Sequence, residues 1–285
     1  MRQLTTTCLL SLALSLAAFG ELHPPAQVTA GKGFSISSTG SGEATFYLIT
    51  PGHVAKRQVK LGQEIAVDAA EVKKAGRYLA IACGSGGCSS AAFYVAAAEP
   101  DKVSFFLHPS RVRVKTNDGI NATAFVFDKF HNLVLTPVTV DFKVVPKKGP
   151  TINRQLKSNH GMAWMRMAST PKEGPVKVIA EVAKASEPRV IQQVASDACN
   201  LRIKAKRTVK GVLIETDPVR DCNGNAVPDG TIVSFTEIDA NGKTTVDAPI
   251  KKGIARTELP ISGSAKISVA SGVVIGNEIS LGGGL

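Results

Sequence analysis

Four oxygen-bearing side chains gather in one short stretch of the chain, "DCNGNAVPDG" at residues 221–230. They are Asp221, Asn223, Asn225 and Asp229. Carboxylate and amide oxygens are the ligands that calcium prefers. A helix–loop–helix calcium loop also needs glycine at its sixth position and an acid at its twelfth, where this chain has Ala226 and Ile232. Since Asp and Asn also bond their own backbone in turns, we expect a structural turn here, with no metal and no other cofactor.

The sequence offers little else that could do chemistry. Its five histidines form no HxxxH or HExxH pattern, and no serine stands in a Gly-x-Ser-x-Gly motif. No catalytic residue can therefore be named, and we expect a non-enzymatic protein.

The N-terminus predicts export. Arg2 precedes the apolar run "CLLSLALSLAAF", and the small residues Ala18 and Gly20 lie where a signal peptidase would recognise them. The alternative, a membrane-spanning helix, is disfavoured because the run is shorter than the ~20 apolar residues that a bilayer requires. We therefore predict a signal peptide over residues 1–20 and an extracytoplasmic mature protein, secreted, periplasmic or on the cell surface, without a transmembrane segment.

Four cysteines follow the predicted signal peptide: Cys83, Cys88, Cys199 and Cys222. An even number in an exported chain favours two disulfides, although four cysteines allow three pairings. We prefer Cys83 with Cys88, across the tip of "CGSGGC", and Cys199 with Cys222. A metal site at the first pair is disfavoured, because exported thiols seldom stay reduced and no histidine lies nearby.

The net charge of +11 is concentrated in the middle of the chain. Residues 99–194 carry 15 Lys and Arg against 8 Asp and Glu, a net +7. In an exported protein this balance suits an acidic partner, such as an anionic polysaccharide, an envelope surface or an acidic protein, and nucleic acid is not expected. Scattered surface charge that only aids solubility remains the alternative.

Two stretches of the chain repeat one pattern. "DKFHNLVLTPVTVDF" at 128–142 and "DCNGNAVPDGTIVSF" at 221–235 share the Asp, the Asn four residues later and the final Phe, and "NHGMA" and "KKGIA" follow them. The period of about 90 residues is that of a domain. Runs such as "VTVDF" and "VKVIAEV" alternate apolar and polar residues, as half-buried strands do. The predicted fold is all-β, with tandem immunoglobulin-like β-sandwich domains.

The first part of the chain carries its own signature. In "DAAEVKKAGRYLAIAC", Tyr78 enters a strand after an acidic turn, as in the tyrosine corner of immunoglobulin-type sandwiches. Ala80 takes the place of the second core cysteine of antibody domains. We therefore predict three domains: an Ig-like sandwich at 21–98 and two repeated sandwiches at 99–194 and 195–285.

The repeated motifs of residues 128–163 and 221–255 resemble the bacterial Ig-like domains of the invasin and intimin type (Big-1-like). The resemblance covers about two thirds of the mature chain. It implies the sandwich fold and a role as spacer or display arm on a bacterial surface, in cell adhesion.

The stretch "HGMAWMRM" is the best candidate for binding. By the parity of the aligned "KGIARTEL", the side chains of Met162, Trp164 and Arg166 face outward, and Ala163, Met165 and Met167 face the core. An exposed Trp beside Met and Arg is typical of an interface centre, to which Lys147 and Lys148 would add a positive rim. The alternative is that the only Trp of the chain lies in the core and that a bulge has shifted the parity.

These observations favour adhesion, or a structural and display role in the bacterial cell envelope, with a protein or an acidic envelope surface as partner. The alternative is a carbohydrate-binding accessory module of an extracytoplasmic system. Such modules stack sugars on exposed aromatic rings, and only 5% of these residues are aromatic.

Overall fold

A computed structural model describes residues 20–261 and 263–282. All regular structure in these residues is β, as predicted, and is divided among 25 strands. Over the same residues, no helix has the length and hydropathy needed to cross a membrane. The predicted signal peptide lies almost wholly outside the described residues.

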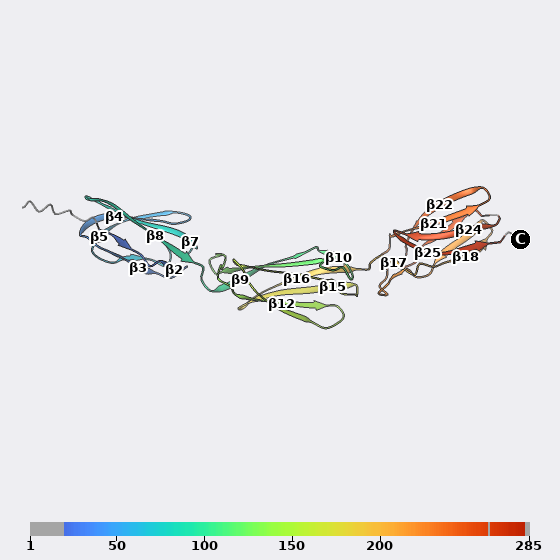
Figure 1. Ribbon diagram of the computed structural model, residues 1–285, viewed down its shortest axis with the longest axis horizontal. Coiled ribbons are helices and arrows are strands. Elements are labelled where there is room, and N and C mark those ends of the chain that lie inside the picture. The colour runs from blue at the N-terminus through green and yellow to red at the C-terminus, as the bar shows by residue number, and fades with distance from the viewer. Residues whose placement is uncertain (1–19, 262, 283–285) are drawn as a thin grey trace, which may run out of the picture. The chain divides into compact units, whose positions relative to one another are not determined.

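The first sandwich pairs a small sheet with a larger one (Figure 1, blue and cyan). The small sheet consists of β1 Leu22–His23, β3 Phe34–Ser38 and β6 Ile65–Val67. The larger has the order β2 Gln27–Thr29, β8 Gly87–Ala96, β7 Gly76–Gly84, β4 Gly42–Ile49 and β5 Val54–Leu61. All of these pairs are antiparallel except β2 with β8.

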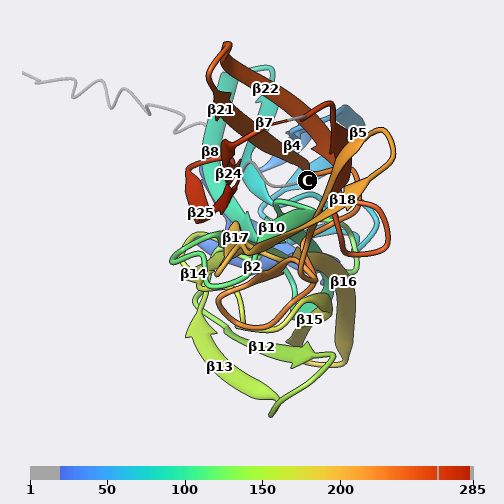
Figure 2. The same ribbon diagram turned by 90° about the vertical axis from the view of Figure 1, so that its right-hand side faces the viewer.

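The second sandwich repeats this arrangement. Its small sheet has the order β14 Met162–Met167, β11 Ile120–Asp128 and β9 Pro100–His108. Its larger sheet has the order β10 Arg111–Arg113, β16 Ala185–Val194, β15 Gly174–Val182, β12 Thr139–Pro146 and β13 Ile152–Lys157. Figure 2 shows the hairpin of β12 and β13 at the margin of this larger sheet. Strands β13 and β14 thus each end a sheet and have one unpaired edge.

The third sandwich also has two main sheets. One has the order β18 Ile203–Thr208, β19 Gly211–Thr216 and β23 Arg256–Leu259, and the other β22 Gly242–Pro249, β21 Ile232–Asp239, β24 Ala265–Ser271 and β25 Val274–Leu281. A short pair, β17 Ala198–Cys199 and β20 Arg220–Asp221, stands beside them.

The chain divides into two compact units. One holds the described residues up to Asp101 together with Phe127–Leu135, and the other holds Lys102–Val126 and Thr136 onward. The first sandwich lies in the first unit, and the third sandwich lies in the second unit with most of the second sandwich. The domain limits at 98/99 and 194/195 stay predictions.

Strict alternation explains these strands. In β15, Val176, Val178, Ala180 and Val182 are buried on one face, as their spacing predicts. In the first sandwich Tyr78 is 1% exposed, and its hydroxyl donates to the Lys74 carbonyl at 2.8 Å, which confirms the tyrosine corner. Ala80 is fully buried, so the core is filled there without a cysteine.

Candidate functional site

The Asp221 loop is a closed turn whose carboxylate is already surrounded by donors. Asp221 Oδ1 accepts the backbone amides of Asn223 at 2.8 Å and Asn225 at 2.9 Å. Oδ2 accepts the Asn225 side-chain amide at 2.8 Å and the Ser196 backbone amide at 3.1 Å. Asp221 is 4% exposed. A cation at this carboxylate would have to displace four N–H donors, so the geometry suits a turn.

Asn225 extends this turn into a contact with the neighbouring sandwich of the same unit. Its Nδ2 donates to the Pro171 carbonyl at 2.9 Å, and its Oδ1 accepts the Glu173 backbone amide at 3.1 Å. Lys172 Nζ donates to the Asn223 carbonyl at 2.7 Å. Asp221 and Asn225 therefore hold the loop before β15 and the connection at Ser196 to one turn. We name this arrangement the Asp–Asn clamp.

The first unit contains the same clamp at Asp128 and Asn132. Asp128 Oδ2 accepts the Ala98 amide at 2.9 Å. Asn132 accepts the Ala75 amide at 2.8 Å and donates to the Lys73 carbonyl at 2.7 Å. The repeated Asp and Asn of the sequence therefore have one role in both copies.

The backbone of the clamp explains which residues between Asp and Asn can vary. The fourth residue of the turn has a positive φ in both copies, 64° at His131 and 78° at Gly224. Glycine adopts this conformation freely, and histidine is among the side chains that tolerate it. The turn requires a residue with positive φ at its fourth position, and it requires the Asp and Asn side chains, which accept backbone amides. The side chains at its second and third positions can vary.

Both clamp carboxyls have a lowered pKa. Burial raises the pKa of Asp221, but the hydrogen bonds from the Asn225 side chain and from the amides of Asn225, Ser196 and Asn223 outweigh it. Burial likewise raises the pKa of Asp128, and four equivalent hydrogen bonds outweigh it and lower that pKa. The carboxylates are thus stabilised in the charged form that accepts these bonds.

No group of three or more His, Cys, Asp or Glu side chains within residues 20–261 and 263–282 is placed to hold a metal ion. The four described cysteines form two disulfides, in the preferred pairs. Cys83–Cys88 closes the tip of the β7–β8 hairpin, and Cys199–Cys222 joins the β17 segment to the clamp turn. The second disulfide therefore covalently supports the residue that follows Asp221.

The outer face of β14 presents the side chains that its parity predicts. Trp164 is 58% and Met162 is 36% exposed, and Arg166 is exposed beside them. Ala163, on the opposite face, is 2% exposed. Trp164 is therefore a surface residue, so no bulge has shifted the register of β14 against β11.

Two aromatic residues that the sequence analysis did not single out lie on the same sheet. Phe106 of β9 is 60% exposed and makes an edge-to-face contact with Phe125 of β11, at 5.9 Å between ring centroids. Consecutive phenylalanines at 105 and 106 could have signalled this, because neighbouring strand residues point to opposite faces. We name the surface formed by Phe106, Phe125, Met162, Trp164 and Arg166 the aromatic face. Lys147 and Lys148 are exposed in the β12–β13 loop of the other sheet and are not part of it.

Comparison with known proteins supports the fold. No protein-family model matches the chain, and no curated protein sequence matches it. The solved structures that are similar over nearly the whole chain include two bacterial proteins. FdeC, an adhesin of Escherichia coli, is 14% identical with a TM-score of 0.62, covering 93% of this chain and 97% of that chain. InvD of Yersinia pseudotuberculosis is 9% identical with a TM-score of 0.53, covering 93% and 97%. At these identities the likeness concerns the fold alone: the chain has the tandem immunoglobulin-like sandwiches seen in bacterial Ig-like adhesin structures.

Proposed function

We propose that this chain is an extracytoplasmic, non-enzymatic protein of the bacterial envelope. Its tandem sandwiches would display a protein-binding surface, the aromatic face, in adhesion or in a larger surface assembly. The observation that carries the proposal is the exposure of Trp164 and Phe106 on one sheet of the most basic part of the chain. The two disulfides and the apolar N-terminal segment support export. The likeness to FdeC, described as an adhesin, supports a role of this class.

The aromatic face has the composition of an interface centre. Trp is among the residues whose truncation costs most at protein interfaces, and Met and Arg are enriched there. An exposed cluster of large apolar side chains is also costly to leave in water, which favours a partner that covers it. Arg166 and the net charge of +7 over residues 99–194 would attract an acidic partner surface.

Site-specific photo-crosslinking in the producing cell tests the proposal. A benzophenone amino acid would replace Trp164 in one variant and Val190 in another, because Val190 is equally exposed, at 59%, on the other sheet of the same sandwich. We expect one discrete adduct from position 164 and none from position 190. The same adducts from both positions, or none from either, would refute a binding role for the aromatic face.

A glycan array separates the carbohydrate-binding alternative. Saturable glycan binding that Trp164→Ala abolishes, and Val190→Ala leaves intact, would favour a carbohydrate module. A protein adduct with an array that stays silent would favour the proposed protein partner.

A further inference from the structure

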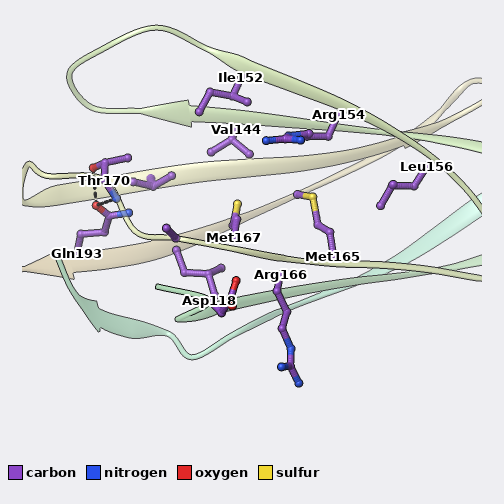
Figure 3. A pocket seen from close by; sticks show the side chains of 13 residues that line it. Asp118, Val144, Ile152, Arg154, Leu156, Met165, Arg166, Met167, Thr170 and Gln193 are labelled. Atoms are coloured by element: carbon purple, nitrogen blue, oxygen red, sulfur yellow. Dashed lines mark hydrogen bonds between the residues drawn. The ribbon is translucent and has the colours of Figure 1, made fainter. Parts of the chain in front are cut away.

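A cavity of about 420 Å³ opens between the two sheets of the second sandwich. The edge strands β13 and β14 form two of its walls, through Ile152, Arg154 and Leu156 on one side and Met165 and Met167 on the other. Residues of β11, β12, β15 and β16 contribute to the lining, together with Asp118, which precedes β11 and is the lining's one carboxylate. Figure 3 shows Arg154 and both methionines directed into this space, while Arg166 points away from it. A volume of this size lies within the range of ligand-binding clefts.

The position of Arg154 recurs in the other two sandwiches. It holds an arginine in the first and a valine in the third. Arg154 stands opposite the buried Phe142 in the β12–β13 pairing. Arg57 stands opposite Phe46 in the first sandwich, and Val246 stands opposite Phe235 in the third. The three residues therefore occupy equivalent places on the edge strand of each sandwich. They lie beside the gap between the two sheets, which we call the seam.

In the first sandwich the arginine closes the seam. Arg57 Nη1 pairs with Glu71 Oε1 at 2.6 Å, and its Nη2 donates to the Ala66 carbonyl of β6 at 2.6 Å. Its guanidinium also lies 5.0 Å from the centre of the Phe46 ring. In the third sandwich Val246 packs against the core instead.

In the second sandwich the same arginine has no such partners. Glu71 stands five residues before Gly76, and the same count before Gly174 reaches Ser169. The Ser169 hydroxyl donates to the Arg113 carbonyl at 2.6 Å and accepts the Thr116 amide, so it is fully engaged elsewhere. Arg154 is exposed, and its guanidinium makes no ion pair or hydrogen bond with any of the described residues.

We propose that this seam binds an extended, acidic segment of another polypeptide. The segment pairs with the free edge of β13, places apolar side chains against Met165, Met167 and Leu156, and presents a carboxylate to Arg154. The first sandwich shows what an arginine at this position takes: a carboxylate and a strand carbonyl. A peptide strand supplies both, and strand addition to an exposed edge is a general mode of peptide recognition. The net charge of +7 over residues 99–194 favours an acidic ligand.

A synthetic peptide tests this site without knowledge of the natural partner. The probe is the acetylated and amidated heptapeptide Ser-Leu-Thr-Glu-Thr-Val-Ser, whose Leu, Glu and Val share one face of a strand, and its control carries Gln in place of Glu. We expect saturable binding to the full mature chain in calorimetry. The Gln peptide, and the variant Arg154→Gln with the Glu peptide, should each bind about 10-fold more weakly, as for loss of one charge-assisted bond.

Two controls assign the effect to the seam. Lys143→Gln removes one positive charge from the outer face of β12 and should leave the affinity unchanged. The Glu peptide should slow amide hydrogen exchange in residues 152–157. It should leave the exchange rates unchanged in residues 54–61 of β5, the equivalent free edge in the first sandwich.

The outcomes decide the proposal. Equal binding to wild type and Arg154→Gln, equal binding of the Glu and Gln peptides, absence of saturable binding, or protection at β5 in place of β13 would each overturn it. So would binding of dodecanoate without binding of the peptide, which would make the seam a lipid site. The two-peptide comparison needs only the wild-type chain, so it stands even if a variant fails to fold. Trp164 takes no part in these measurements, so this proposal can fail while the aromatic face stands.

Discussion

Replacing Asp221 by Asn should destabilise the third sandwich by about 3–6 kcal/mol. The substitution keeps the shape of the side chain, but one of its two terminal atoms becomes an N–H donor. If the amide nitrogen takes the Oδ2 position, it faces the Ser196 amide and the Asn225 side chain, which are both donors. At the Oδ1 position it faces the amides of Asn223 and Asn225. Either way two bonds to a charged acceptor are lost, each worth about 1.5–3 kcal/mol.

The assay must resolve single sandwiches, because a chain of several domains does not unfold in one two-state step. Amide hydrogen exchange in increasing urea, followed by mass spectrometry on peptides from 232–239, reports the opening of β21 in the third sandwich. With a denaturant slope of about 1–3 kcal/mol per molar, the loss corresponds to a midpoint lower by roughly 2 M. Peptides from 42–49 in β4 of the first unit should keep the wild-type midpoint.

Asn223→Ala is the matched control. The Asn223 carbonyl accepts Lys172, whereas its side chain has no hydrogen bond to any described residue, so the clamp should lose less than about 0.5 kcal/mol. A calcium site would behave differently, because it would need the Asn223 oxygen and would be stabilised by millimolar calcium. Wild-type stability in Asp221→Asn, or a calcium-dependent midpoint that both variants abolish, would refute the reasoning.

Three further predictions concern titration and the first core. The lowered pKa values of Asp128 and Asp221 contribute stability that is complete above the unfolded value of about 3.9 and is lost as pH falls through the folded values, so thermal midpoints should drop steeply below about pH 4; a flat profile would contradict this. Tyr78→Phe removes the bond to the Lys74 carbonyl and should cost about 1 kcal/mol in urea unfolding. Burial raises the pKa of Glu237, so its charged form opposes folding, and Glu237→Gln should raise the unfolding midpoint at neutral pH, with a gain that vanishes in acid.

The sequence predicts well what depends on neighbouring residues. Alternation identifies the buried face of β15 and the outward direction of Trp164, because both follow from the two-residue period of a strand. The tyrosine corner is equally local, since Tyr78 bonds to a carbonyl only four residues away. The turn at Asp221 also follows from its Asp, Asn and Gly content, whereas in the other copy the positive φ falls on His131.

Contacts between distant residues are harder to predict. The Asp221 turn is visible in the sequence, but its bonds to Ser196 and Pro171 span 25 and 54 residues. The only available signal was that both repeats keep the Asp and the Asn while the residues between them change. Identity at these two positions alone indicates side chains with the same structural role. The clamp shows that role in each unit.

The sequence of the second sandwich alone does not predict its open seam. The seam is recognised by its difference from the other two sandwiches of the chain. An arginine on an edge strand is ordinary, and Arg57 and Arg154 look alike in sequence. They differ because the partner of Arg57, Glu71, lies 14 residues away in a turn whose counterpart holds Ser169. Whether the arginine has a carboxylate partner thus depends on a residue outside its own strand. The alternation of apolar and polar residues within the strand cannot predict this.

Strand β14 contributes to both proposed surfaces through opposite parities. Trp164 belongs to the aromatic face, whereas Met165 and Met167 line the seam. Because adjacent residues of a strand point to opposite faces, a substitution at one parity leaves the other surface chemically intact. A change that bends or unpairs β14 would damage both. Loss of both binding activities from one substitution would therefore indicate displacement of β14 from β11, while a selective loss assigns the activity to one face of the strand.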